Sequence, residues 1–137
     1  MAQPPRIAGG LSQLTAPALL LLLCAFQVKH FLGDFVLQNE FILKNRRVWG
    51  HPGGMLHVLI HAVLTLPILI VAGVAVPLLF AIVLVEALFH YHVDWLKDLW
   101  VHRMGWSPSD KQFWWLTGAD QAVHQLSYLA IAALLAG

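Results

Sequence analysis

Four apolar stretches, each long or nearly long enough to cross a lipid bilayer, constrain the fold of this chain more than any other feature. They cover about residues 14–37, 55–74, 76–100 and 119–135. A helix needs about 20 residues to cross a hydrocarbon core of about 30 Å. The composition agrees with membrane insertion, because 59% of the 137 residues are hydrophobic and only 11% are charged. We therefore predict a single all-α domain over residues 1–137, built as a polytopic membrane four-helix bundle.

Basic residues are distributed unequally over the two sides of such a bundle. The loop after the first stretch and the loop after the third carry or adjoin six of them: Lys44, Arg46, Arg47, Lys97, Arg103 and Lys111. The opposite side has only Arg6. By the positive-inside rule, the two long loops are cytoplasmic and both termini lie on the outer side of the membrane.

Each apolar stretch also contains ionisable residues spaced four apart, although charge at membrane depth is costly. Residues at i and i+4 lie on the same face of a helix. These residues fall at the ends of the first and third stretches and at the starts of the second and fourth, so an up-and-down bundle brings them to one depth near the cytoplasmic face. The nine residues are His30, Asp34, His57, His61, Glu86, His90, Asp94, Asp120 and His124.

Nine oxygen and nitrogen ligands are too many for one metal ion and suit two divalent ions. Facing helices with inward carboxylates and histidines are a known way to build a two-metal site in a helical bundle. Because the ligands are imidazoles and carboxylates without a thiolate, Zn or Mn is favoured and Fe is possible. We predict that all nine residues are metal ligands, and Glu86 could instead be the catalytic general base. A purely structural network of hydrogen-bonded His and Asp is the alternative.

Other polar residues are placed outside the predicted metal site. His92 lies two positions from His90 and therefore points to another face of the helix. Further polar side chains could orient the ligands by hydrogen bonding. These are Gln27, Gln38, Gln121, Gln125, Ser127 and Tyr128.

A metal pair near the headgroup level is positioned to act on the polar part of a lipid. It could lower the pKa of a bound water and polarise a phosphoryl or acyl oxygen. The sequence therefore predicts a metal-dependent hydrolase that acts on a lipid or amphipathic (phospho)ester at the cytoplasmic leaflet. A di-iron oxidoreductase of the desaturase, hydroxylase or oxidase type is one alternative, and a non-enzymatic metal-binding subunit or transporter is another.

The expected partners are membrane lipids and the small-molecule substrate. A homo-oligomer or a larger membrane complex also fits, since four short helices make a thin wall around two ions. Nucleic acid is not expected, because the chain has no basic stripe that would follow phosphates.

Four motifs, HFLGDFVLQ, HVLIH, EALFHYHVDWLKD and DQAVHQL, together resemble a family of small bacterial inner-membrane proteins, domain of unknown function 3307. The resemblance covers nearly the whole chain from about residue 25 onward. It implies a location in the bacterial inner membrane with periplasmic termini, but it implies no particular activity. A looser similarity is to membrane-bound metal-dependent hydrolases, which also carry His and Asp pairs near helix ends.

Overall fold

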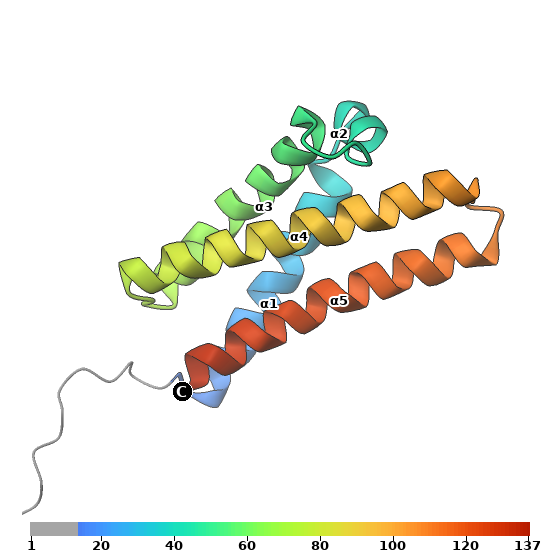
Figure 1. Cartoon of the computed structure of the whole chain (residues 1–137). Coiled ribbons are helices and arrows are strands. Elements are labelled where there is room, and N and C mark those ends of the chain that lie inside the picture. Colours follow the sequence, from blue (N-terminus) through green and yellow to red (C-terminus); the bar gives the residue numbers. More distant parts are fainter. Residues whose placement is uncertain (1–13) are drawn as a thin grey trace, which may run out of the picture.

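The computed structural model describes residues 14–137, and regular structure in this part of the chain is helical (Figure 1). The elements are α1 (Ala16–Phe31), the π-helix η1 (Leu32–Val36) that continues it, α2 (Glu40–Asn45), α3 (Pro52–Val71), α4 (Val76–Met104) and α5 (Lys111–Ala136). No strand occurs within residues 14–137, which confirms the all-α prediction. Arg6, which entered the argument on orientation, lies outside the described residues.

Three helical segments are long and apolar enough to cross a membrane: Ala16–Val36, Pro52–Val71 and Val76–Met104. Within the described residues, α5 is not among them. Its first half, KQFWWLTGADQ, mixes polar and aromatic residues. The structure thus supports a membrane protein on the basis of three segments, whereas the predicted fourth span rests on the apolar second half of α5.

The helix ends differ from the ends of the apolar stretches, because local capping decides them. α3 begins at Pro52, where proline is tolerated in the first turn and the His51 side chain accepts a hydrogen bond from the Gly53 N–H (3.0 Å). α4 runs past residue 100 and ends at Gly105, whose φ of 67° lies in the left-handed region that glycine favours. α5 begins at Lys111, well before the predicted residue 119.

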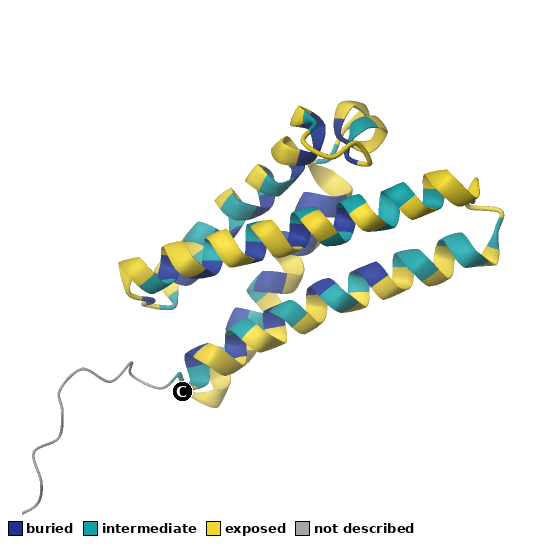
Figure 2. Ribbon diagram, viewed as in Figure 1, coloured by how far each residue is buried: buried dark blue, intermediate teal, exposed yellow. Residues whose placement is uncertain are grey.

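The four long helices pack in a closed series of pairs. α3 packs against α4, α4 against α5, and α1 against both α3 and α5. Because of the connection at residues 105–110, α4 and α5 run in opposite directions side by side (Figure 1). Buried residues form stripes along the helices, and the exposed stripes between them are rich in Leu, Val and Phe (Figure 2). Such outer faces suit contact with lipid.

The interior has an apolar half and a polar half. The apolar half, toward the turn between α3 and α4, consists of Leu22, Phe26, Leu69, Val74, Leu79, Ile82, Tyr128, Ala132 and Leu135. The polar half, toward the loops that flank α2 and precede α5, contains the buried histidines and carboxylates. Ionisable residues from all four long helices therefore lie at one end of the interior.

α2 and its flanking loops cover this polar half. Asn39 caps α2 by accepting a hydrogen bond from the Ile42 N–H (3.1 Å), and the Ile42 side chain is fully buried. Arg46, at the end of α2, forms an ion pair with Asp98 of α4. The short helix is therefore fixed to α4 directly beside the buried polar residues.

Candidate metal centre

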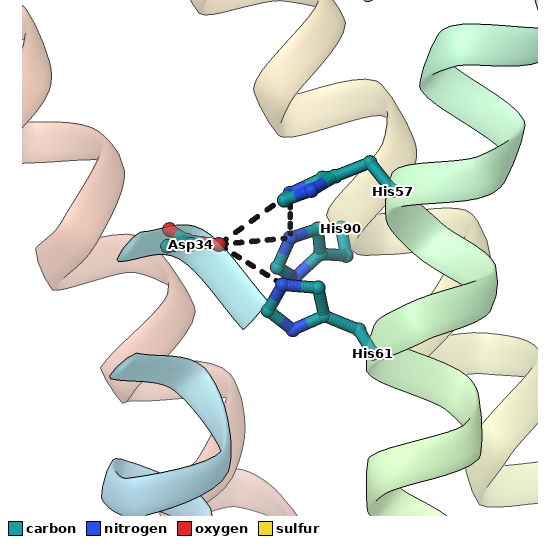
Figure 3. Close-up of side chains that lie close together, drawn as sticks. All are labelled: Asp34, His57, His61 and His90. Atoms are coloured by element: carbon teal, nitrogen blue, oxygen red, sulfur yellow. Dashed lines mark hydrogen bonds and ion pairs between the residues drawn. The ribbon is translucent and has the colours of Figure 1, made fainter. Parts of the chain in front are cut away.

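The centre of the polar half is a compact group of four side chains (Figure 3). Asp34 comes from η1, His57 and His61 from α3, and His90 from α4. Asp34 Oδ1 lies 3.4 Å from His57 Nε2 and 2.9 Å from His61 Nε2. His90 Nε2 lies 3.9 Å from the same oxygen and 3.2 Å from His57 Nε2. Ligand atoms around tetrahedral zinc, at bond lengths of about 2.0–2.1 Å, are about 3.3 Å apart. The four atoms therefore have the spacing of a tetrahedral ligand set.

A second group shares His90 with the first and adds Asp94 of α4 and His124 of α5. Asp94 Oδ2 lies 2.8 Å from His57 Nε2 and 3.4 Å from His90 Nε2. The other oxygen of Asp94, Oδ1, lies 3.1 Å from His124 Nε2. The Asp94 carboxylate thus connects the two groups. We refer to all six residues as the His/Asp cluster: Asp34, His57, His61, His90, Asp94 and His124.

Many polar atoms at this site are buried without a hydrogen-bond partner. Within residues 14–137, seven buried side-chain nitrogen or oxygen atoms have none, and all but Thr117 Oγ1 belong to predicted site residues. These six atoms are Asp34 Oδ1, His57 Nδ1, His61 Nε2, His90 Nδ1, Asp94 Oδ2 and Asp120 Oδ1. A buried polar atom left without a partner costs about 1–3 kcal/mol. Their concentration at one place indicates that the site is built for a ligand that is not part of the chain.

Local features of the sequence bring these side chains together. The HVLIH segment is helical, so its two histidines lie one turn apart on the buried face of α3. Asp34 lies in a π-helix, an irregularity that is frequent at functional sites. Gly33 allows η1 to approach α3, because a Cβ atom at this position would lie 2.2 Å from His61 Nε2. A side chain at position 33 would therefore displace the His61 ring.

His30 and Asp120, both predicted ligands, lie beside the His/Asp cluster and outside the two candidate ligand groups. His30 Nδ1 is hydrogen-bonded to the Tyr128 hydroxyl (2.9 Å), and His30 Nε2 to Gln121 Oε1 (3.0 Å). Asp120 Oδ1 lies 3.5 Å from His124 Nε2. Tyr128 and Gln121 are thus two of the polar neighbours expected to orient the site, and direct ligation by His30 or Asp120 stays a prediction.

Glu86, the predicted catalytic residue, is engaged with partners outside the cluster. Lys29 of α1 donates to Glu86 Oε1 in a buried ion pair, and the Thr65 hydroxyl donates to Oε2 (2.8 Å). Lys29 Nζ also lies 3.4 Å from His61 Nδ1. Both oxygens of Glu86 therefore have protein partners, and its catalytic role stays a prediction.

Three residues that position the site were missed by sequence reasoning. Lys29 could have been found, because a lysine inside an apolar stretch is itself a signal of a functional site. Gly33 also carried a signal, since glycine weakens a helix and often marks a close approach of two backbones. Thr65 gave no such signal, because a single threonine in an apolar helix is common.

Arg46 borders the cluster on its loop side. Its Nε donates to Asp98, and its Nη1 lies 3.6 Å from Asp94 Oδ2. Burial alone would lower the pKa of the Arg46 guanidinium, but the carboxylates of Asp94 and Asp98 raise this pKa above its ordinary value. A permanent positive charge is therefore present where a molecule entering from the headgroup side would approach the cluster.

The fold and the site together define a helical protein with three membrane-type segments and buried His/Asp groups that could hold a metal ion. The chain matches the family described as "Protein of unknown function (DUF3307)" over residues 19–136, and it belongs to that family. This confirms the resemblance drawn from the sequence motifs. No curated protein and no solved structure matches the chain.

Proposed function

We propose that the protein is an integral membrane metalloenzyme that holds two divalent ions and hydrolyses a lipid or amphipathic (phospho)ester at the cytoplasmic leaflet. The observation that carries this proposal is the convergence of unpartnered atoms, Asp34 Oδ1, His61 Nε2 and Asp94 Oδ2, at the spacing of metal ligands. A network of hydrogen bonds alone would satisfy these atoms instead of leaving them free.

In this proposal the two groups of the His/Asp cluster are the two ion sites. One ion is held by Asp34, His57, His61 and His90. The second is held around Asp94 and His124, where Asp120 is also near. Asp94 supports the pairing of the sites, because its two oxygens face different histidines.

The donor set of imidazole nitrogens and carboxylate oxygens suits Zn or Mn best and also fits Fe. Ions of this kind lower the pKa of a bound water and polarise a phosphoryl or acyl oxygen. The protein contributes a buried, dry site and the positive charge of Arg46, which would attract an anionic ester.

We further propose that α5 is the fourth span of a membrane four-helix bundle in the bacterial inner membrane, with both termini periplasmic. α5 supplies His124 to the cluster and packs along α4, so the two helices share one depth. The basic residues of the two long loops support a cytoplasmic position for the cluster end.

Elemental analysis of the purified protein in mild detergent tests the proposal. We expect about two zinc or manganese ions per chain, a number that follows from the two groups of ligands. His90→Ala should abolish the stoichiometric metal, because His90 belongs to both groups. His92→Ala is the matched control, since His92 is exposed on the same helix and its Nδ1 bonds to the Leu88 carbonyl (2.7 Å). Absence of metal from the wild-type protein, or equal metal in both variants, would overturn the proposal.

A membrane di-iron oxidoreductase is a second candidate function. It is favoured by the supply of carboxylates and histidines from several facing helices, a pattern found in di-iron bundles. The same elemental analysis separates the two functions. Two iron ions with a visible absorption band would indicate oxygen chemistry, whereas zinc or manganese would indicate hydrolysis.

A further inference from the structure

A groove of about 630 Å³ lies between α4 and α5, on the side of the cluster away from the long loops. Its walls are almost entirely apolar, with Ile82, Val85 and Phe89 on α4 and Ala130 on α5. Its volume is within the range of about 300–1,000 Å³ that is usual for small-molecule sites.

The groove leads directly to the His/Asp cluster. On α4 it ends at Phe89, the residue before His90, and on α5 it ends at Val123, the residue before His124. Because α4 and α5 run in opposite directions, these two ends meet at the same level of the structure (Figure 1). One end of the groove therefore adjoins two histidines of the candidate metal centre.

The polar groups of the groove are found in the half next to the cluster. Glu86 and Ser127 are its only ionisable or hydroxyl-bearing lining residues, and the lining from Leu78 to Ile82 on α4 is wholly apolar. The Ser127 hydroxyl donates to the His124 carbonyl (2.7 Å), which fixes it close to the cluster. The groove thus has a polar near end and an apolar far end, as an amphipathic ligand requires.

The dimensions of the groove suit one hydrocarbon chain. From Leu78 to Phe89 it follows α4 for about 16 Å, at a rise of about 1.5 Å per residue. This length is close to half of a hydrocarbon core of about 30 Å. Side chains at its rim, such as Val85 and Leu126, are exposed and would face lipid, so a chain could enter sideways from the bilayer.

A second groove, between α1 and α3, provides a comparison within the same molecule. It has nearly the same volume, about 600 Å³, and is lined by residues such as Ala18, Leu21, Pro67 and Val71. Its lining contains no polar side chain and none of the residues adjacent to the cluster histidines. Lipid contact alone would favour the two grooves equally, whereas only the α4/α5 groove leads to the site.

We propose that the α4/α5 groove binds the single long hydrocarbon chain of an amphipathic substrate, with the polar end of the substrate at the His/Asp cluster. The identity of the bound molecule as a substrate rests on the proposed function, but binding of the chain in the groove requires no metal. The ligand class is therefore a long-chain amphiphile with a polar or anionic end.

Photo-crosslinking of the full chain in phosphatidylcholine nanodiscs tests this inference. The probes are two long-chain alkyl phosphates, one with a diazirine beside the phosphate and one with a diazirine at the end of the chain. We expect the first probe to modify residues near Phe89 and Val123, and the second to modify residues near Leu78 and Leu134. The reversed order, or equal labelling of the α1/α3 groove, would overturn the inference.

Two matched tryptophan substitutions provide the control. Ala130→Trp fills the α4/α5 groove and should reduce labelling by about tenfold or more, as expected when a pocket is overfilled. Ala18→Trp fills the α1/α3 groove and should leave the labelling unchanged. Equal losses in both variants would contradict the inference.

The remaining outcomes separate this inference from the proposed function. If the α4/α5 residues are unlabelled and a cysteine at position 130 crosslinks two chains, a second copy covers the groove and the inference is wrong. Metal content is measured on the same samples. Bound metal with scattered labelling rejects the groove alone, whereas ordered labelling without metal rejects the metal-dependent function and leaves the groove as a lipid site.

Discussion

The His/Asp cluster and the Lys29–Glu86 pair are two charged regions buried in the same apolar helices, and they differ in how their atoms are satisfied. Glu86 accepts from Lys29 and from Thr65, so the pair is complete within the protein. In the cluster, by contrast, Asp34 Oδ1 and Asp94 Oδ2 are buried without a hydrogen-bond partner. Buried charge by itself therefore does not identify a ligand site in this protein. Unpartnered atoms that converge at ligand spacing do.

The two regions meet at His61. One of its ring nitrogens, Nε2, lies 2.9 Å from Asp34 Oδ1, and the other, Nδ1, lies 3.4 Å from Lys29 Nζ. The Lys29–Glu86 pair is thus in contact with the cluster, and a change in one region could affect the other. The following substitutions are chosen to separate the two regions.

Gly33→Ala should give the largest effect, and it acts on the cluster. The added Cβ atom would lie 2.2 Å from His61 Nε2, so the ring would have to leave the ligand group. We expect metal affinity to fall by about 100-fold or more, at or beyond the upper end of what a lost supporting contact causes. Competition with a metal chelator measures the change.

Leu135→Ala is the control for general loss of stability. Leu135 lies in the apolar half of the interior, and its truncation should cost about 2–5 kcal/mol without loss of metal. Full metal content in the Gly33→Ala protein would show that His61 is not a ligand.

Lys29→Met and Glu86→Gln should each act on stability, and their effects should not add. Either change leaves one buried charge or its partner unpaired, which typically costs about 3–5 kcal/mol. The double variant removes both charges and should recover most of this loss. Unfolding by denaturant in detergent provides the free energies for a double-mutant cycle. Strictly additive losses would show that the two residues are not coupled.

Metal content in the double variant sharpens the comparison further. If the Lys29–Glu86 pair is structural, the variant without both charges should retain its metal. Loss of metal with stability preserved would instead assign Glu86 to the metal site, as the sequence predicted.

Tyr128→Phe should give the smallest effect. The change removes the hydrogen bond between the hydroxyl and His30 Nδ1 (2.9 Å) but keeps the stacking on Phe26, whose ring centroid is 4.9 Å away. We expect a loss of about 1 kcal/mol in the free energy of unfolding and little change in metal content. A large loss of metal would mean that His30 is itself a ligand whose orientation depends on Tyr128.

Much of the site could be predicted from the sequence because helical periodicity is local. An i,i+4 spacing such as that of His57 and His61 fixes a common helix face whatever the rest of the fold does. The positions of such pairs near helix ends, combined with up-and-down topology, then predict one shared level. Six of the nine predicted residues do meet in the His/Asp cluster.

The tertiary structure alone decided which charged residues became partners of one another. Glu86 and His90 are one turn apart on α4, yet Glu86 pairs with Lys29 whereas His90 lies among the cluster histidines. The difference depends on how α1, η1 and α3 pack against α4, including the close approach that Gly33 permits. The sequence by itself determined the helices, their apolar surfaces and the level of the polar residues, because these follow from composition and a fixed helical repeat. The partners were decided by long-range packing, because the rotation and separation of neighbouring helices depend on contacts that no local pattern encodes.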